Sequence, residues 1–199
     1  MNNCSLSNGL TIKTKETFDN IVKVAHRQFS KRGYKNTSIH IIAKKAKLSV
    51  GCIYKYFKNK DELYKYIISE EQIKIKDYIN LRIKDYSTRF DKEVEGLRAW
   101  LFYVRENPNV YKLIWESLFY DKNSFDEYYN NFASSYAKAL KHDQEEISNN
   151  DYFTDAFMLI GISNFLGVQL MSSKEEYTDE KINQMVDTFA STLKNGLIK

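Results

Sequence analysis

Helix-compatible sequence runs through this chain almost without a break, since a single proline, Pro108, interrupts its 199 residues. Proline and glycine are the residues least favourable inside a helix, and the chain has only seven glycines. Apolar residues recur at three- and four-residue steps, as at Ile21, Ala25 and Phe29, which places them on one helix face. No sustained two-residue alternation and no internal repeat is seen. The sequence therefore predicts an all-α fold of about nine helices.

Local signals predict where these helices begin and end. Residues suited to cap a helix N-terminus precede the first four predicted helices: Thr14, Thr37 or Ser38, Ser49 and Asn59. Gly33 follows two cations and is expected to end the first helix. The fourth helix is expected to run to about residue 86, and Thr178 is expected to cap the last. Later helices are predicted at 91–106, 109–120, 125–147, 151–171 and 179–197.

Positive charge is concentrated at the N-terminal end of the chain. Residues 1–65 hold 14 lysines and arginines against four acidic residues, whereas residues 66–199 hold 16 against 22. The overall charge of +4 therefore divides into +10 and −6. Such a local excess is typical of a segment that meets phosphates or an anionic membrane surface. We expect two domains: residues 1–60, with an N-terminal leader and a basic helix-turn-helix, and residues 61–199, a helical body.

The sequence offers little support for catalysis. The three histidines, His26, His40 and His142, have no spacing that a zinc site would require. There is no glycine-rich phosphate loop and no nucleophile-elbow motif. We therefore expect no enzyme activity, no cofactor and no metal.

A soluble, cytoplasmic protein is expected. Residues 1–15 lack the apolar core of a secretion signal. The most apolar stretch, residues 156–171, is shorter than the roughly 20 residues that cross a bilayer. Cys4 and Cys52 form no disulfide framework and are expected to be free thiols.

The stretch "SVGCIYKYFKNKDEL", residues 49–63, has the chemistry of a DNA-binding helix. Gly51 permits close backbone approach, and Ser49 with the free amides of the first helical turn can bind phosphate. Tyr54 and Tyr56 offer hydroxyl donors with Lys55 between them. A short helix of this kind fits a major groove about 12 Å wide, with Lys58 and Lys60 on the phosphate edge. The alternative is an ordinary solvated face rich in tyrosine and lysine.

Residues 14–63 resemble the N-terminal DNA-binding domain of the tetracycline-repressor (TetR) family. The residues that match the family pattern are Ser38, Ile42, Ala43, Ala46, Ser49, Gly51, Tyr54, Tyr56, Phe57, Lys60 and Leu63. One departure is Lys47, where the family usually has a glycine in the turn. A left-handed backbone at that position would be strained for lysine but tolerable.

The resemblance implies which residues contact DNA. Ser38 and Tyr56 would bind phosphate, as would Lys60 at the start of the fourth helix. His40 would face bases or backbone from the second helix. The residues implied to enter the major groove are Val50, Gly51, Cys52 and Lys55. The resemblance also implies a homodimeric, ligand-responsive transcriptional regulator, most often a repressor, on a near-palindromic operator whose half-sites lie about 34–36 Å apart.

By the same resemblance, the body would bind a small-molecule effector and pair with a second subunit. Candidate effector-binding residues are Trp100, Tyr103, Trp115, Glu116, Phe119, Phe132 and Tyr136. Candidate dimer-interface residues on the helix near 152–171 are Phe153, Phe157, Ile160, Gly161, Phe165 and Val168. Alternatively, the aromatic residues are ordinary core, and this helix is the central core helix of a monomer.

Two other functions remain open from the sequence. One is an enzyme or small-molecule carrier whose basic segment docks on anionic surfaces. The other is a constitutive DNA-binding dimer with a filled core and no effector.

Overall fold

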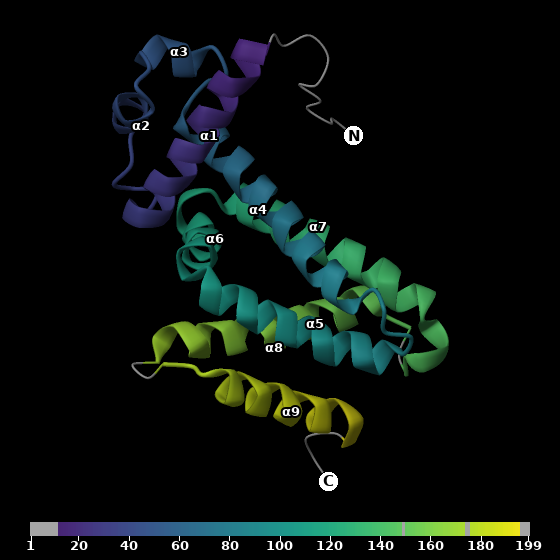
Figure 1. Ribbon diagram of the computed structural model, residues 1–199. Helices are drawn as coiled ribbons and strands as arrows, with labels where there is room; N and C mark the ends of the chain where they lie inside the picture. Colours follow the sequence, from purple (N-terminus) through teal and green to yellow (C-terminus); the bar gives the residue numbers. More distant parts are fainter. Residues whose placement is uncertain (1–11, 149, 174–175, 196–199) are drawn as a thin grey trace.

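The computed structural model describes residues 12–148, 150–173 and 176–195, so the expected leader and Cys4 lie outside the described residues. Within these ranges the chain forms nine α-helices, one short 3-10 helix and no strand (Figure 1). The helices are α1 (Ile12–Arg32), α2 (Ile39–Ala46), α3 (Val50–Tyr54), α4 (Lys60–Ile83), α5 (Arg89–Glu106), α6 (Pro108–Tyr120), α7 (Lys122–His142), α8 (Tyr152–Ser172) and α9 (Asp179–Asn195). The predicted fold class is confirmed.

The predicted caps of α2, α3 and α4 are confirmed. The side-chain oxygens of Ser38, Ser49 and Asn59 each accept a hydrogen bond from a backbone N–H in the first turn of the helix that follows. Gly33 ends α1 with a positive φ of 75°. The prediction for Thr14 is wrong, because α1 begins at Ile12 and so contains it. Nothing in the residues just ahead of Thr14 is unfavourable in a helix.

Two helix ends also differ from the prediction. The four-residue step from Ile53 to Phe57 predicts a third helix from Ser49 to Phe57, but α3 stops at Tyr54, and the chain then turns towards the cap of α4. The helix predicted at 125–147 spans Lys122–His142 and is followed by the 3-10 helix Gln144–Glu146. Phe57 follows Ile53 by four residues and Ile147 follows Leu140 by seven, so helical spacing alone extended both helices past their true ends.

Helices α1, α2 and α3 form a module at one end of the molecule, and α4 leaves it and runs along the body (Figure 1). The body is built from α5 to α9, with α5 in contact with α4, α8 and α9. One apolar core is continuous through both parts: it contains Phe29 and Ile53 in the module and Leu101 in the body. Buried Tyr64, on α4, donates a hydrogen bond to the carbonyl of Leu113 on α6, at 2.7 Å.

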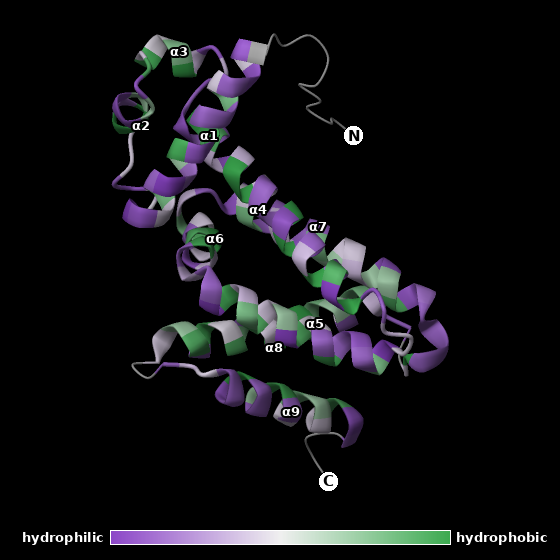
Figure 2. Cartoon of the chain, in the orientation of Figure 1, coloured by the Kyte–Doolittle hydropathy of each residue, from purple (hydrophilic) through white to green (hydrophobic). Residues whose placement is uncertain are grey.

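The long helix α8 is covered on one side only. Only four of its residues are buried: Ala156, Ile160, Asn164 and Gly167. The alternative that α8 is a central core helix of a monomer is therefore wrong. Figure 2 shows hydrophobic residues on α8, whereas α9 carries a hydrophilic face.

At 21 residues, α8 is long and apolar enough to cross a membrane by length and composition alone. The shortness of residues 156–171 therefore does not exclude a membrane-spanning helix.

Candidate nucleic-acid interface and body cavity

The module holds α3 by burying one side of it. Ile53 and Phe57 are buried, and the ring of Phe18, from α1, stacks on Phe57 with centroids 5.5 Å apart. On α2, the buried residues are Ile39, Ile42, Ala43 and Ala46. These apolar contacts fix the orientation of α3, so the residues on its other side have defined positions.

The opposite side of α3 faces solvent. Ser49, Gly51, Tyr54 and Lys55 are exposed, and so is His40 on α2, whereas Val50 and Cys52 are partly buried. A Cβ at Gly51 would meet no atom within 4 Å, so this part of the helix is open to a large partner. Most of the sequence-predicted contact residues of α2 and α3 are thus accessible to a partner, as contact with a DNA groove requires.

The turn between α2 and α3 has the backbone that the resemblance required. Lys47 adopts a left-handed conformation, with φ 57° and ψ 40°, and is the only non-glycine residue with positive φ in the described part of the chain. The N–H of the following residue, Leu48, donates to the carbonyl of Ala43 at 3.0 Å. This is the usual way in which a glycine ends a helix, here performed by lysine.

Two residues expected at phosphates also fasten the module itself. The Tyr56 hydroxyl donates to the carbonyl of Thr14 at 3.3 Å, and Lys60 Nζ donates to the carbonyl of Tyr34 at 3.1 Å. Lys60 Nζ also lies 3.8 Å from the centre of the Tyr34 ring. Their contact with phosphate stays a prediction, as it does for Ser38, whose hydroxyl caps α2.

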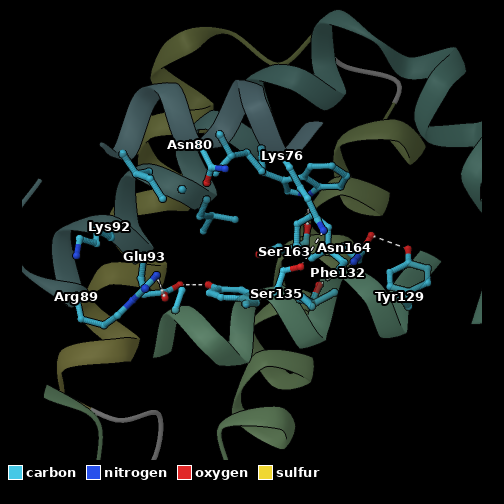
Figure 3. Close-up of a pocket in the computed structure, with 18 of the residues that line it drawn as sticks. Lys76, Asn80, Arg89, Lys92, Glu93, Tyr129, Phe132, Ser135, Ser163 and Asn164 are labelled. Atoms are coloured by element: carbon cyan, nitrogen blue, oxygen red, sulfur yellow. Dashed lines mark hydrogen bonds and ion pairs between the residues drawn. The ribbon is translucent and has the colours of Figure 1, made fainter. Parts of the chain in front are cut away.

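A cavity of about 240 Å³ lies in the body, bounded by α4, α5, α7 and α8, with one residue from α9 (Figure 3). Its wall includes three of the predicted effector residues: Trp100, Phe132 and Tyr136. The Trp100 indole donates to the carbonyl of Ser163 at 3.0 Å, which holds this ring against α8. Gly167, also on α8, leaves room for the neighbouring Tyr111 ring, because a Cβ there would lie 3.1 Å from that ring.

The other four predicted effector residues lie outside the cavity. Tyr103 is buried and donates to Glu71, Trp115 packs against Tyr111, and Phe119 is 79% exposed. Glu116 accepts a hydrogen bond from the backbone N–H of Tyr34 at 3.1 Å and therefore joins α6 to the end of α1. Spacing along one helix could not separate these rings from the cavity wall, because the separation depends on how α5 and α6 pack.

The polar residues of the cavity were missed from the sequence. At one end, the carboxylate of Glu93 pairs with Arg89 and accepts a hydrogen bond from Tyr136. Burial raises the pKa of Glu93, and the Arg89 charge opposes that rise. Asp143 Oδ2 lies 3.1 Å from Lys92 Nζ and 3.5 Å from the Arg89 guanidinium. Arg89, Lys92 and Glu93 lie on α5, but Tyr136 and Asp143 meet them only through the packing of α7, so the sequence did not identify this cluster.

The predicted dimer-interface residues divide between two sides of α8. Phe153, Phe157 and Phe165 are exposed, Phe165 to 70%, whereas Gly161 and Val168 are partly buried. Ile160 faces the chain's own core and the cavity, so it is not part of the exposed face. We define the α8 face as five of the exposed apolar residues of this helix: Phe153, Phe157, Met158, Ile162 and Phe165.

A basic helix-turn-helix fused to a helical body with an internal cavity defines a class of DNA-binding regulators. Residues 21–67 match the family model described as bacterial regulatory proteins, tetR family. An HTH-type transcriptional regulator of Staphylococcus aureus (strain bovine RF122 / ET3-1) is 30% identical over 128 residues, which cover 60% of this chain and 69% of that relative. This chain belongs to the TetR family of bacterial transcriptional regulators.

Solved structures share the fold at low identity. The fatty acid degradation regulator FadR from Bacillus halodurans has a TM-score of 0.76 and 17% identity, with 91% of this chain and 96% of that chain covered. AibR, in complex with isovaleryl coenzyme A and operator DNA, has a TM-score of 0.65 and 18% identity, with 88% and 97% covered. The fold therefore extends beyond the N-terminal module to the whole body.

Proposed function

We propose that this TetR-family regulator is a homodimeric repressor that binds a near-palindromic operator in the cytoplasm and is released by a small molecule in the body cavity. The observation that carries the proposal is the cavity of about 240 Å³ beside α4, the helix that begins at the edge of the DNA-binding module. AibR, which shares the fold, forms a complex with both isovaleryl coenzyme A and operator DNA.

The contacts of the body with the module support transmission between the two sites. Trp100, in the cavity wall, stacks parallel to Tyr103 with ring centres 6.5 Å apart. The Tyr103 hydroxyl donates to Glu71 Oε2 at 3.2 Å, and Glu71 Oε1 lies 3.3 Å from His26 Nε2 on α1. A ligand that moves Trp100 would therefore disturb a buried contact that reaches α1. A ligand can shift the equilibrium between the DNA-binding and the released arrangement of the protein only by as much as its affinities for the two arrangements differ.

The DNA contacts of the proposal are those on the exposed side of α2 and α3. The groove-facing residues are Val50, Gly51, Cys52, Tyr54 and Lys55, with His40 beside them. Phosphate contacts are assigned to Ser38, Ser49, Tyr56 and Lys60. In a two-fold dimer the two α3 helices would enter successive major grooves on one side of the duplex.

Selection of bound fragments from random duplex DNA with the purified protein tests the proposal. We expect enriched sequences with two inverted half-sites, one helical turn apart. Enrichment of single, unpaired half-sites would contradict the dimer. The same duplexes then report release: a small molecule that raises the melting temperature of the protein is expected to weaken DNA binding.

The alternatives make different predictions. A constitutive dimer with a filled core is disfavoured by the cavity. A carrier or enzyme that uses the basic segment for docking should bind anionic lipid vesicles and not duplex DNA, and the family names instead describe transcription regulators.

A further inference from the structure

The charges around the body cavity are unevenly compensated. Arg89 pairs with Glu93, and Lys92 pairs with Asp143, so these cations have carboxylate partners. Lys76, which lines the cavity from α4, forms no ion pair with a carboxylate of the described residues. Its ammonium group donates a hydrogen bond to the neutral hydroxyl of Ser135, at 3.0 Å. One wall of the cavity therefore carries an ammonium group without a counter-charge.

Lys76 lies at the cavity wall and is partly buried there. Its Nζ lies 5.6 Å from the centre of the Phe132 ring, and Figure 3 shows its side chain reaching from α4 towards Ser135 and Asn164. Burial lowers the pKa of Lys76 from its ordinary 10.5, with no opposing charge. A lysine loses hydration when it is buried, and an anion beside it would replace that lost stabilisation.

The rest of the cavity is suited to a hydrocarbon. Its apolar wall includes Ile79, Ile83, Leu97, Trp100, Ile160 and Phe189. Its volume of about 240 Å³ lies just below the roughly 300–1,000 Å³ of sites for drug-sized ligands, so a compact occupant fits best. The Glu93 carboxylate at the far end is already paired, so it leaves no free negative charge for a cationic ligand.

We propose that the cavity binds a compact apolar carboxylate, such as a medium-chain fatty acid, whose carboxylate pairs with Lys76 and whose hydrocarbon chain lies against Trp100 and Ile160. The proposal rests on the proposed function, because it names the ligand class of the same cavity. The Ser135 hydroxyl, which accepts a hydrogen bond from Lys76 Nζ at 3.0 Å, would keep the ammonium group at the cavity wall. Only an anionic ligand would neutralise the positive charge of Lys76.

Calorimetric titration of the full chain without DNA tests the ligand class. The probes are octanoate, the uncharged octanamide of equal length, the cation octylamine, and octanoyl coenzyme A. We expect octanoate to bind about 10- to 100-fold more tightly than octanamide, the range for a charge-assisted hydrogen bond. Equal binding of octanoate and octanamide, or tighter binding of octylamine, would overturn the proposal. Octanoyl coenzyme A as the only ligand would also overturn it, in favour of a thioester.

Variants assign the carboxylate to Lys76. Lys76→Met keeps the apolar stem and is expected to reduce the preference for octanoate over octanamide to near unity, whereas Lys76→Arg keeps it. Lys84→Met, which removes an exposed lysine at the end of α4, is the matched control and should change neither affinity. An unchanged preference in Lys76→Met would refute the role of Lys76. The comparison of probes on the unmodified protein decides the ligand class even if Lys76→Met fails to fold.

The outcome separates the ligand class from the proposed function. Octanoate that binds without weakening operator binding would refute ligand-controlled release but leave the ligand class intact. Release of DNA by uncharged molecules, with no binding of octanoate, would refute the ligand class and leave the proposed function intact.

Discussion

Lys47 is the residue at which sequence and backbone conformation conflict. Its left-handed backbone costs an L-residue roughly 1–2 kcal/mol, while glycine adopts it freely. We therefore expect Lys47→Gly to raise the free energy of unfolding by about 1 kcal/mol, after allowance for the greater flexibility of glycine in the unfolded chain. Urea unfolding measures the change.

Lys44→Gly is the matched control for this substitution. It removes the same charge from an exposed position of α2, but there the backbone is helical, so glycine should lower the free energy of unfolding by about 1 kcal/mol. If both variants lose stability, the left-handed turn is not strained by lysine.

Glu71 is a buried carboxylate whose ionised form is stabilised by its neighbours. Burial would raise its pKa, but hydrogen bonds from His26 and Lys74 outweigh burial and lower the pKa below its ordinary 4.5. The folded state therefore binds this proton more weakly than the unfolded state. The stabilisation is present above pH 4.5 and is lost as the pH falls through the lowered folded-state pKa.

We expect the unfolding free energy of the unmodified protein to decrease more steeply below pH 4.5 than that of Glu71→Gln, which has no such proton to bind. Urea unfolding at a series of acidic pH values measures both slopes. Glu70→Gln, at the partly exposed neighbouring position, is the control and should retain the slope of the unmodified protein. Identical slopes for Glu71→Gln and the unmodified protein would show that Glu71 does not contribute.

At the scale of elements, α3 and the start of α4 are expected to make different contributions to DNA binding. Lys55 lies at the exposed end of α3, and Lys58 lies in the turn that follows. Lys55→Ala should change which bases are preferred, with a loss of about 1–3 kcal/mol on the selected operator and less on random DNA. Lys58→Ala should weaken binding to all duplexes similarly and reduce the salt dependence by about one counterion.

Binding titrations on operator and random duplexes, at several salt concentrations, distinguish these outcomes. Equal losses on both duplexes for Lys55→Ala would remove its role in base recognition.

Elements with strong local signals were predictable from the sequence. Caps at Ser38, Ser49 and Asn59 are set by side chains that bond to nearby backbone, so local sequence is sufficient. The cavity was predictable only in part, since Trp100 and Phe132 are apolar wall residues at helical spacing, whereas Lys76 lines it through the packing of α4 against α7. The role of Glu116 could not be predicted either, because the residue that donates to it, Tyr34, lies 82 positions away in the sequence.

At the scale of the whole molecule, the α8 face exposes five apolar residues to solvent. A helix whose apolar residues point outward on one side is typical of a subunit interface. In the proposed dimer this face would pair with its copy around a two-fold axis, and so would hold the two modules at a fixed spacing. Dimerisation and operator binding should therefore fail together.

Phe165→Asp tests this coupling. Placing a charge at a residue that is 70% exposed in the single chain should leave the fold intact, but in a dimer it would bury an unpaired carboxylate. We expect dimerisation to weaken by at least about 2 kcal/mol, or roughly 30-fold, and operator affinity to fall with it. Leu81→Asp, at an apolar residue of α4 that is 62% exposed, is the matched control and should remain dimeric. Sedimentation at micromolar concentration decides: an unmodified protein that is monomeric, or a Phe165→Asp variant as dimeric as the control, would show that the α8 face does not join the subunits.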